Sequence, residues 1–462
     1  MTNEKKIAKV LEQTRWWIET RYRRTRHVIK KTGRIASTAF NKAITFSRNA
    51  TVPLVTALYC VAAAPLIYDL LWRAQTTPSS NVTELRDILL SLGALLGTPF
   101  VAWRTLVAWK QAETVQQTHL TDLFTKAVEQ LGAEKEGIDK SGQPTRKPNT
   151  EQRIGAILAL ERIAHDSAKD YWRVMEVLAS YIRNNSQPPT IFTEPTSDAV
   201  DLESALAKFR EQIPTPPTDI QVAIDVLARR GSRGTAFERK HRLRLDLSGV
   251  NLQKIRFSRW YDDETGATNA TFTHVDFNCA HLDECELIDA NFSNCIFNNA
   301  SLIGVTAYSA ILKNATFYEA NLDGANFAGA NLKGADIQKA KGRGCDMSEA
   351  NLRDGGLISC DLSRSNFRNA NLAKSGVGGN NFAHADISGV DLSQTHFFGN
   401  VLKDASVYDV DFTKLDTRFI EDKLNLENAY GDTTTKTGSL NRPASWPDRE
   451  LSWQERREKL EI

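Results

Sequence analysis

Residues 320–339 read ANLDGANFAGANLKGADIQK, in which an apolar side chain returns at every fifth position. The phase holds from Leu247 to Phe412, where 30 of the 34 positions in steps of five are Leu, Phe, Ile, Val or Met. The exceptions are Asp262, Ala267, Ala307 and Gly342. A period of five matches neither the helical period of about 3.6 nor the strand period of about two. The stretch therefore predicts a solenoid whose chain turns a corner after each short segment.

A small side chain stands two residues before each large one, as at Ala320, Ala325 and Ala330. We expect both to point inward and to stack on their equivalents in neighbouring coils, with polar residues outside or at corners. The motif A(D/N)Lxx, repeated four times in residues 320–339, closely resembles the pentapeptide-repeat family. That resemblance implies a right-handed quadrilateral β-helix over residues 243–415, with four pentapeptides to a coil. The rod would have about eight and a half coils and, at sheet-like spacing, a length of about 40 Å.

Charge is divided unevenly along the chain, although the net charge is only +2. Residues 1–50 hold 13 Lys or Arg against 3 acids, whereas residues 243–415 hold 15 against 21. The six cysteines are placed as follows: Cys285, Cys295, Cys345 and Cys360 at the small inward position, Cys279 in a repeat turn, and Cys60 in an apolar run. No CxxC or Cys/His cluster occurs, so we interpret the thiols as small buried side chains in a reducing compartment.

The first 110 residues indicate a membrane anchor. Residues 1–50 combine Arg and Lys with aromatic side chains, as in a basic amphipathic segment that lies on an anionic leaflet. The region 51–110 holds two apolar runs, 52–72 and 88–109, each about long enough to cross a bilayer. We therefore predict a two-helix transmembrane hairpin; a buried hairpin in a soluble domain is the alternative. Nucleic-acid binding by the basic segment is the less favoured interpretation, because the apolar runs make lipid the nearer polyanion.

A GxxxG pattern, Gly93 to Gly97, lies inside the second apolar run. Such a pattern lets another helix approach closely. The partner would be the first apolar run of the same chain or the same run of a second copy, which would make the protein a homo-oligomer.

Between the apolar runs and the rod, residues 111–186 show helical periodicity interrupted by a Gly- and Pro-rich stretch at 132–152, which predicts a flexible loop. Three pieces of this region, FTKAVEQLG, RIGAILALERIA and VMEVL, resemble the helical module that precedes the rod in bacterial membrane pentapeptide-repeat proteins. Residues 187–242 indicate a Pro- and Thr-rich linker, with a short helix from Leu202 to Phe209 and a helix at 217–230 that would cap the rod. Residues 416–462 would form the C-terminal cap and tail. The predicted fold is thus multidomain α + β.

No catalytic motif is found: Walker-type phosphate loop, HExxH, GxSxG and paired Cys/His spacing are all absent from the sequence. His165 before Asp166 is more simply structural than a catalytic base, and we expect neither an enzyme nor a cofactor. Departures from the repeat are the candidate contacts for a protein partner, although a loop that merely tolerates insertion would give the same pattern. They are the insertion-like Trp260, Tyr261, Asp262, Asp263 and Glu264, and the basic Lys339, Lys341 and Arg343.

Three functions remain open. The favoured one is a membrane-anchored protein-interaction scaffold with a lipid bilayer and a protein as its partners. The second is a DNA-mimicking regulator of a type II topoisomerase, which the resemblance implies because some members of the family bind gyrase; the weakly acidic rod argues against it. The third is a signal-responsive membrane effector. The positive-inside rule places both termini in the cytoplasm, at a bacterial inner membrane.

Overall fold

The computed structural model describes residues 82–138, 142–193, 202–257, 260–262, 266–415, 426, 428–438, 440 and 442–459. Contacts divide the chain into two compact units, residues 1–118 and 119–462. The basic segment 1–50, the first apolar run and Cys60 lie outside the described residues. The rod, its helical module and both of its caps belong to the second unit.

Helix α3, Val82–Leu131, contains the second apolar run. No helix among the described residues is both long enough and apolar enough to cross a membrane. The predicted transmembrane hairpin is therefore not supported: Thr98, Pro99 and Arg104 interrupt the apolar character of the second run, and the first run is not described. Several large apolar side chains of α3 are nevertheless exposed, including Leu89, Leu90, Phe100, Val101, Trp103 and Trp109.

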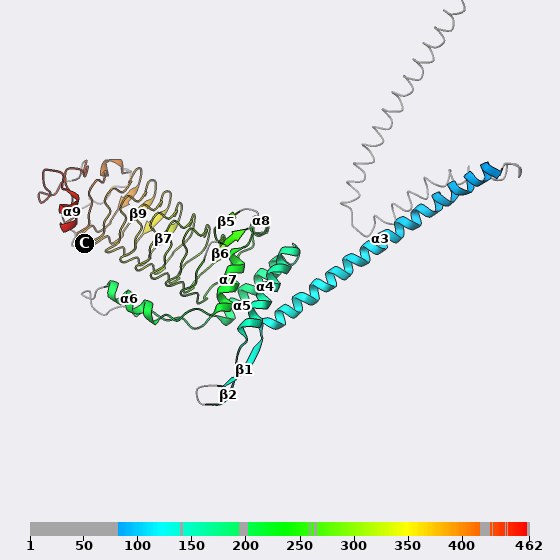
Figure 1. Ribbon diagram of the computed structural model, residues 1–462. Coiled ribbons are helices and arrows are strands. Elements are labelled where there is room, and N and C mark those ends of the chain that lie inside the picture. The colour runs from blue at the N-terminus through cyan, green and yellow to red at the C-terminus, as the bar shows by residue number, and fades with distance from the viewer. Residues whose placement is uncertain are drawn as a thin grey trace, which may run out of the picture. The chain divides into compact units, whose positions relative to one another are not determined.

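The rod is a stack of coils in which each residue pairs with the residue twenty positions later (Figure 1). Four parallel ladders run along it, which we call faces. Face A holds every twentieth residue from Thr271 to Asp391, face B from Asp276 to His396, face C from His281 to Val401, and face D from Glu286 to Ser406. Four pentapeptides to a coil follow directly from this register.

Each pentapeptide ends in a tight turn. The N–H of Ala315 donates to the carbonyl of Leu312 at 3.1 Å, and Asn314 between them has a φ of 55°. A positive φ at the third position is typical of a type II turn. The residue before the large one stabilises the turn, because its side-chain oxygen accepts a hydrogen bond from the backbone amide two residues later. For example, Ser293 N–H donates to Asn291 Oδ1 at 3.0 Å. This bond explains why Asn and Asp recur there.

The inward prediction is confirmed. The large and small inward side chains, such as Phe327 and Ala330, are buried. Phenylalanines of face B stack along the axis, with ring centroids 5.2 Å apart for Phe277 and Phe297 and 5.1 Å apart for Phe297 and Phe317. One cluster of buried apolar side chains extends from the end of α3 through the helical module and the rod to Trp446.

The first coil contains an antiparallel hairpin of β4, Trp260–Asp262, and β5, Gly266–Thr268. In that coil Arg256 pairs with Glu286, thirty residues away, whereas Thr271 pairs with Asn291, twenty away. Ten extra residues therefore leave the stack, and positions 262 and 267 belong to the hairpin and not to the ladders. The remaining 32 of the sequence positions make eight coils of four, so the sequence count of eight and a half was too high.

The helical module consists of α4, Thr150–Asp166, α5, Tyr171–Asn185, α7, Thr218–Ala228, and α8, Ser232–His241. The prediction of a flexible loop at 132–152 is wrong for about half of its length, because ten of its 21 residues form an antiparallel pair of β1, Glu134–Ile138, and β2, Pro144–Pro148. Buried charges inside the module are paired: Arg230 Nη1 lies 3.1 Å from Glu238 Oε2, and Tyr171 donates to Oε1 of the same glutamate at 2.7 Å. Such pairing is what makes burial of these groups tolerable.

All four faces of the first coil end on a polar group of this module. Asp246, in β3 (Leu245–Asp246), which pairs with β6 (Val275–Asp276), accepts from Arg183 at its carbonyl at 2.6 Å. The amides of Asn251 and Thr271 donate to Ser186 Oγ and to the carbonyl of Ala228, at 3.4 and 3.2 Å. Gln221 on α7 accepts from Arg256 N–H at 3.1 Å and donates to its carbonyl at 2.8 Å. Helix α7 lies within the stretch 217–230 for which the sequence predicts a cap helix, and α5 contributes to the same end of the rod.

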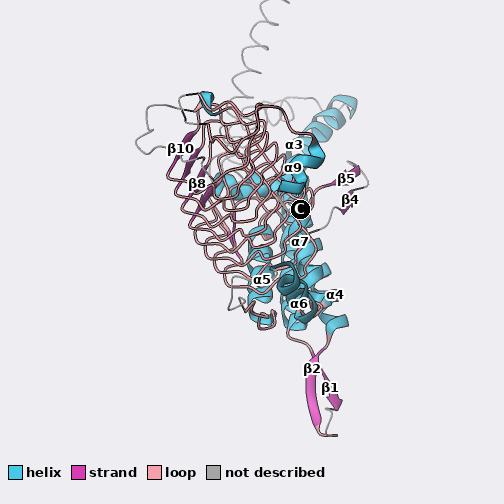
Figure 2. Ribbon diagram, turned by 90° about the vertical axis from the view of Figure 1, so that its left-hand side faces the viewer, coloured by secondary structure: helices cyan, strands magenta, loops and turns pink. Residues whose placement is uncertain are grey.

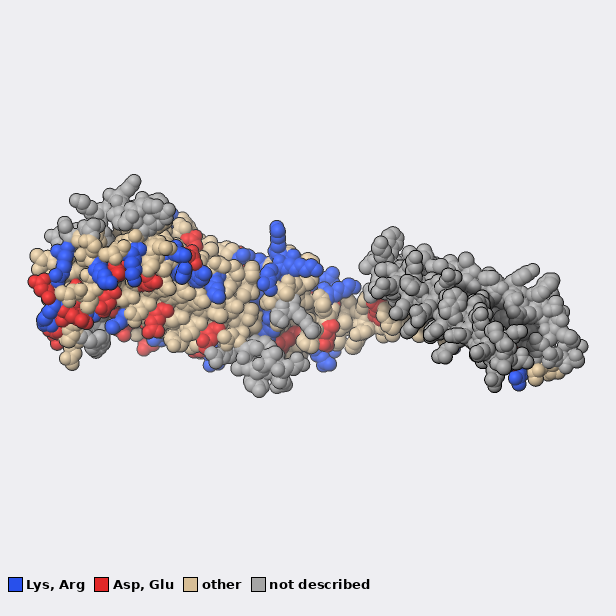
Figure 3. Space-filling model, turned by 90° about the horizontal axis from the view of Figure 1, so that it is seen from above, with Lys and Arg blue, Asp and Glu red and all other residues tan. Residues whose placement is uncertain are grey.

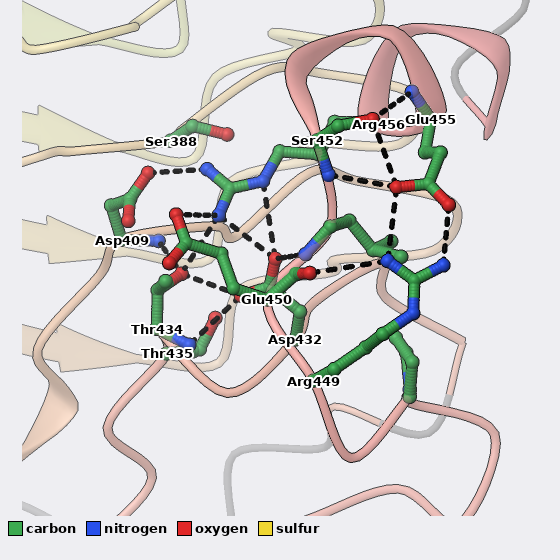
Figure 4. A network of polar contacts seen from close by, with 12 residues as sticks. Ser388, Asp409, Asp432, Thr434, Thr435, Arg449, Glu450, Ser452, Glu455 and Arg456 are labelled. Carbon is green, nitrogen blue, oxygen red and sulfur yellow. Dashed lines mark hydrogen bonds and ion pairs between the residues drawn. The ribbon is translucent and has the colours of Figure 1, made fainter.

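The other end of the rod is closed by residues 426–459. Tyr430 and Lys436 extend two ladders by pairing with Ser406 and Asp411. Helix α9, Trp453–Lys459, is held by Arg456, whose guanidinium lies 2.8 Å from Asp432 and 2.6 Å from Asp409 (Figure 4). Burial alone would raise the pKa of Asp432. Hydrogen bonds from Thr434 and Leu451 and the charge of Arg456 together outweigh burial, so the pKa of this carboxyl lies below its ordinary value. A short η1 turn, Phe412–Lys414, precedes this segment.

The Gln221 contact predicts a measurable capping energy. Gln221→Ala leaves the edge N–H and C=O of Arg256 without protein partners, which should lower the free energy of unfolding by about 1–2 kcal/mol. Gln212→Ala, at an exposed glutamine of α6 (Leu202–Gln212), should change it by less than about 0.5 kcal/mol. Urea denaturation followed by circular dichroism measures both. Equal midpoints for the two variants would show that the glutamine is not a cap.

Candidate interaction surface

Face B changes its backbone after residue 335. Its pentapeptides form four short parallel strands, β7 (Asp336–Gln338), β8 (Gly356–Ile358), β9 (Gly376–Gly378) and β10 (His396–Phe398). They pair in strict register, each residue with the one twenty positions later. The sheet order is β10-β9-β8-β7.

Two asparagines at the small inward position support this sheet. Asn380 Oδ1 accepts from the amide of Cys360 at 2.9 Å, and its Nδ2 donates to the carbonyl of Leu357 at 2.7 Å. Asn400 repeats the pattern on the amide of Asn380 and the carbonyl of Val377, both at 3.0 Å. These side chains satisfy the backbone groups that the repeat turn satisfies elsewhere, so the strands need no turn bond of their own.

Glycines interrupt the outer side of the sheet. Gly356, Gly376 and Gly378 do not have positive φ, unlike the glycines at the corners. Their backbone angles therefore do not require glycine, and glycine in a strand interior weakens the sheet unless something approaches the backbone closely. The ring of Phe398 lies within 2.6 Å of where a Cβ of Gly378 would be, whereas a Cβ at Gly356 or Gly376 would meet only Asp336 Oδ1 at 3.3 Å or Ile358 Cδ1 at 3.7 Å.

The result is a flat, uncharged surface, which we call the glycine patch: Gly356, Ile358, Gly376, Gly378 and Phe398. Phe398 is 41% exposed. None of residues 356–359, 376–379 and 396–399 is Asp, Glu, Lys or Arg, although a quarter of the chain is charged. Figure 2 shows β8 and β10 along one side of the rod, and α6 and α9 on the opposite side.

Charge is segregated on the other faces. Face A presents Lys313, Lys333, Arg353 and Lys374, opposed in those coils by Asp354 alone. Face D presents mainly acidic side chains, Glu286, Asp289, Asp346, Glu349, Asp386 and Asp409, with Arg368 among them. Figure 3 shows Lys and Arg recurring along the rod in the view from above, with Asp and Glu beside them. Strands β8, β9 and β10, which hold no Asp, Glu, Lys or Arg, are therefore a local departure from a charged rod.

The predicted contact residues fall into separate places. Trp260, Tyr261 and Asp262 form β4 of the hairpin in the first coil, and Asp263 and Glu264 lie outside the described residues. The structure thus shows a real insertion there, far along the rod from the glycine patch. Its role as a contact stays a prediction.

The basic cluster is not one patch. Lys339 lies over the Tyr318 ring and donates to its hydroxyl at 2.6 Å, which holds its pKa above the ordinary value. Arg343 turns the other way, onto the fully buried Asp323, with Nε 3.1 Å from Oδ2. Lys341 stands between them on face C. Lys339 and Arg343 therefore point to different partners within the rod.

Gly93, Gly97 and His165 do not lie beside other candidate residues in the part of the chain that the structure describes. A Cβ added at Gly93 or at Gly97 would meet no atom within 4 Å, so no described helix packs on either glycine. His165 is almost fully exposed, with its Nδ1 3.3 Å from Asp166 at the end of α4. Neither position lies in a built site.

Among the described residues no group of three His, Cys, Asp or Glu side chains is placed to hold a metal ion. Four thiols are instead buried in the coils, and three of them donate to coil carbonyls: Cys295 to Phe272 at 2.7 Å, Cys285 to Leu252 at 2.9 Å, and Cys360 to Ile337 at 3.2 Å. Burial raises the pKa of all four, to about 12 for Cys295 and to about 11 for Cys360. They should be inert.

A thiol titration tests this assignment. In a Cys60→Ser background, Ellman's reagent should react rapidly with the exposed Cys279 alone. Cys285, Cys295, Cys345 and Cys360 should react only after the rod is unfolded in guanidinium. Rapid reaction of more than one thiol in the native protein would contradict the closed interior.

Models of known families match the rod. Residues 290–357 match the pentapeptide repeat region, and residues 268–304, 345–375 and 381–413 match pentapeptide repeats. The rod is therefore a pentapeptide-repeat solenoid, as its motif predicted. The bacterial origin and the membrane anchoring stay predictions. No curated protein matches the chain.

Solved structures that resemble the chain come from pentapeptide-repeat proteins and a resistance protein. Full-length QnrB1, described as a plasmid-mediated fluoroquinolone resistance protein, is 16% identical over 41% of this chain and 92% of its own, with a TM-score of 0.18. Rfr23 of the cyanobacterium Cyanothece is 20% identical over 40% and 97%, with a TM-score of 0.15. HetL of Nostoc, involved in heterocyst differentiation regulation, is 20% identical over 38% and 96%, with a TM-score of 0.12. At these values the likenesses carry no conclusion about function.

Proposed function

We propose that this chain is a non-catalytic protein-interaction scaffold and that the glycine patch is its docking surface. The observation that carries the proposal is the set of strand glycines whose backbone angles do not require glycine. Glycines at ordinary backbone angles and an exposed phenylalanine on the uncharged strands β8, β9 and β10 favour close contact with another protein's apolar surface. Pentapeptide-repeat regions supply the rigid frame for such a surface.

The arrangement of polar groups supports a binding role over catalysis. The most buried ionisable groups, such as Asp323 and Glu238, are engaged in ion pairs with arginines. Asp283, whose pKa burial raises, accepts from Gln253, from Ser301 and from the amide of Ile303. Groups held in this way stabilise the fold, whereas a catalytic site gathers perturbed groups beside a substrate.

A DNA-mimicking role is less well supported by the charge pattern. Double-stranded DNA carries one charge about every 1.7 Å of axis. On face D, the coils at residues 306–309 and 326–329 hold no carboxylate, which separates Glu286 and Asp289 from Asp346 and Glu349. Such a gap does not reproduce a continuous phosphate row.

Substitutions at the glycine patch test the scaffold proposal. Gly376→Asn fills the bare strand with little strain, because a Cβ there meets only Ile358 Cδ1, at 3.7 Å. Phe398→Glu places a charge on the patch. Each should lower recovery of crosslinked partner from cells by about tenfold or more, at unchanged thermal stability.

The matched control is Tyr308→Glu, which charges an exposed aromatic residue of face D. It should leave partner recovery unchanged. Partner recovery that survives both patch variants, or that falls equally with Tyr308→Glu, would remove the patch as the docking surface. Recovery of a type II topoisomerase that rises with Tyr308→Glu, which adds a carboxylate to the gap at residues 306–309, would favour DNA mimicry.

We also propose that the scaffold is held at the cytoplasmic side of a membrane with both of its termini in the cytoplasm. Support comes from the basic segment 1–50 and the apolar run 52–72, and this proposal does not require a two-helix crossing. Large exposed apolar side chains on α3, such as Phe100 and Trp103, are a further surface that lipid would cover.

Cell fractionation tests the attachment. The full chain should sediment with membranes, and a chain that begins at residue 82 should shift largely to the supernatant. A reporter fused after Ile462 and active only in the cytoplasm should be active. A full chain that stays in the supernatant would contradict membrane attachment without affecting the docking proposal.

A further inference from the structure

Helix α6, Leu202–Gln212, lies against the rod with its own small core. Phe209 and Ile213 are buried on Ile303 of face C, and Leu206 and Phe192 pack at the edges. The rings of Phe192 and Phe209 meet edge to face, with centroids 5.1 Å apart. This cluster is separate from the main core of the rod, so the helix contributes little to the interior of the coils.

The rod is shaped to receive a helix at this corner. Gly304, Gly324 and Gly344 occupy the same corner of three consecutive coils, each with positive φ. A Cβ at Gly324 would lie 2.4 Å from Leu206 Cδ1, and one at Gly344 would lie 3.3 Å from Leu202 Cδ2. Most other corners carry side chains at positive φ, such as Asn314 and Lys374, so conformation alone does not demand three glycines here. Together with Ile303 and Glu284 they form what we call the corner groove.

The resident helix satisfies this groove incompletely. Arg210 Nε lies 2.5 Å from Glu284 Oε2, where the arginine is 58% exposed and the glutamate only 9%. The other oxygen, Oε1, is buried and has no hydrogen-bond partner in the part of the chain that the structure describes. A Cβ at Gly304 would lie 2.0 Å from Oε1, so this oxygen rests directly over the glycine. A buried, unsatisfied carboxylate oxygen is costly, and a helix that supplied a second N–H donor to it would bind better than α6 does.

We propose that α6 is a displaceable occupant of the corner groove, and that the groove binds an amphipathic helix of a partner protein. The partner helix carries the pattern of α6: aliphatic residues matching Leu202 and Leu206, an aromatic residue matching Phe209, and a basic residue for Glu284. Charge complementarity with Glu284 and the fit of a helix over the glycines select this occupant. The groove lies on a different face from the glycine patch and does not depend on it.

A peptide stands in for the partner helix in the test. The probe is fluorescein-labelled LESALAKFREQI, residues 202–213, followed by fluorescence anisotropy. The native chain, whose groove is filled, should bind it at least tenfold more weakly than a Phe209→Asp chain, in which the resident helix is unseated. Binding should disappear again in a Phe209→Asp, Ile303→Asp chain, because Ile303 forms the groove floor. A peptide with the Arg210→Leu change should bind at least tenfold more weakly than the parent peptide.

Hydrogen exchange of the intact native chain provides the second measurement. Amides of α6 should exchange at least a hundredfold faster than those of the coils beneath it, because displacement needs only local opening. Exchange of α6 at the rate of the coils would overturn displacement. Absence of peptide binding to a Phe209→Asp chain whose coils still melt as in the native protein would overturn the groove as a helix receptor.

Discussion

The structure depends on one repeated interaction, the backbone hydrogen bonding between neighbouring coils, whose paired residues lie twenty positions apart in the central coils. It forces every coil to match the next in length and phase, because each coil supplies the partners of its neighbour. The same requirement makes the two ends costly, since the terminal coils have a neighbour on one side only. At the first coil, the side-chain amide of Gln221 takes the place of a further coil: it accepts a hydrogen bond from Arg256 N–H and donates one to the Arg256 carbonyl. At the other end, Tyr430 and Lys436 continue the ladder before Arg456 fastens the last helix.

Because the coils repeat so regularly, the positions that depart from the repeat are informative. Where the repeat turn is lost on face B, Asn380 and Asn400 take over its hydrogen bonds, and the backbone becomes flat enough for strands. Only on such a sheet can glycine at ordinary backbone angles leave a bare surface. The corner groove arises differently, from glycines at turn positions, where α6 needs room. The glycine patch and the corner groove therefore share one feature: each contains glycine at positions where the repeat would allow a side chain.

The sequence predicted what periodicity encodes: the inward stacks, the corners, the capping helix at 217–230 and the buried cysteines. It did not reveal the hairpin, because ten inserted residues are two periods and leave the phase intact, so Asp262 and Ala267 were counted as inward. The role of Asn380 and Asn400 could not be predicted, because the repeat pattern only indicates a small side chain at their positions. Their hydrogen-bond partners lie in neighbouring coils. The packing of α6 depends on contacts between distant segments, such as Arg210 with Glu284, and no local pattern reports those. The prediction of a transmembrane hairpin rests on the length of the two apolar runs. Length alone does not register that Pro99 and Arg104 make the second run less apolar.

The offset of the first coil affects the order in which the rod forms. Central coils close loops of twenty residues, whereas Arg256 and Glu286 close one of thirty, and Ser406 and Tyr430 one of twenty-four. Loop-closure entropy rises with length, and the hairpin must also be accommodated before the first coil can seat on the second. Assembly should thus nucleate among the uniform coils and spread outward, like a helix–coil transition in one dimension. The hairpin coil and the C-terminal cap would then be the last parts to order and the first to fray.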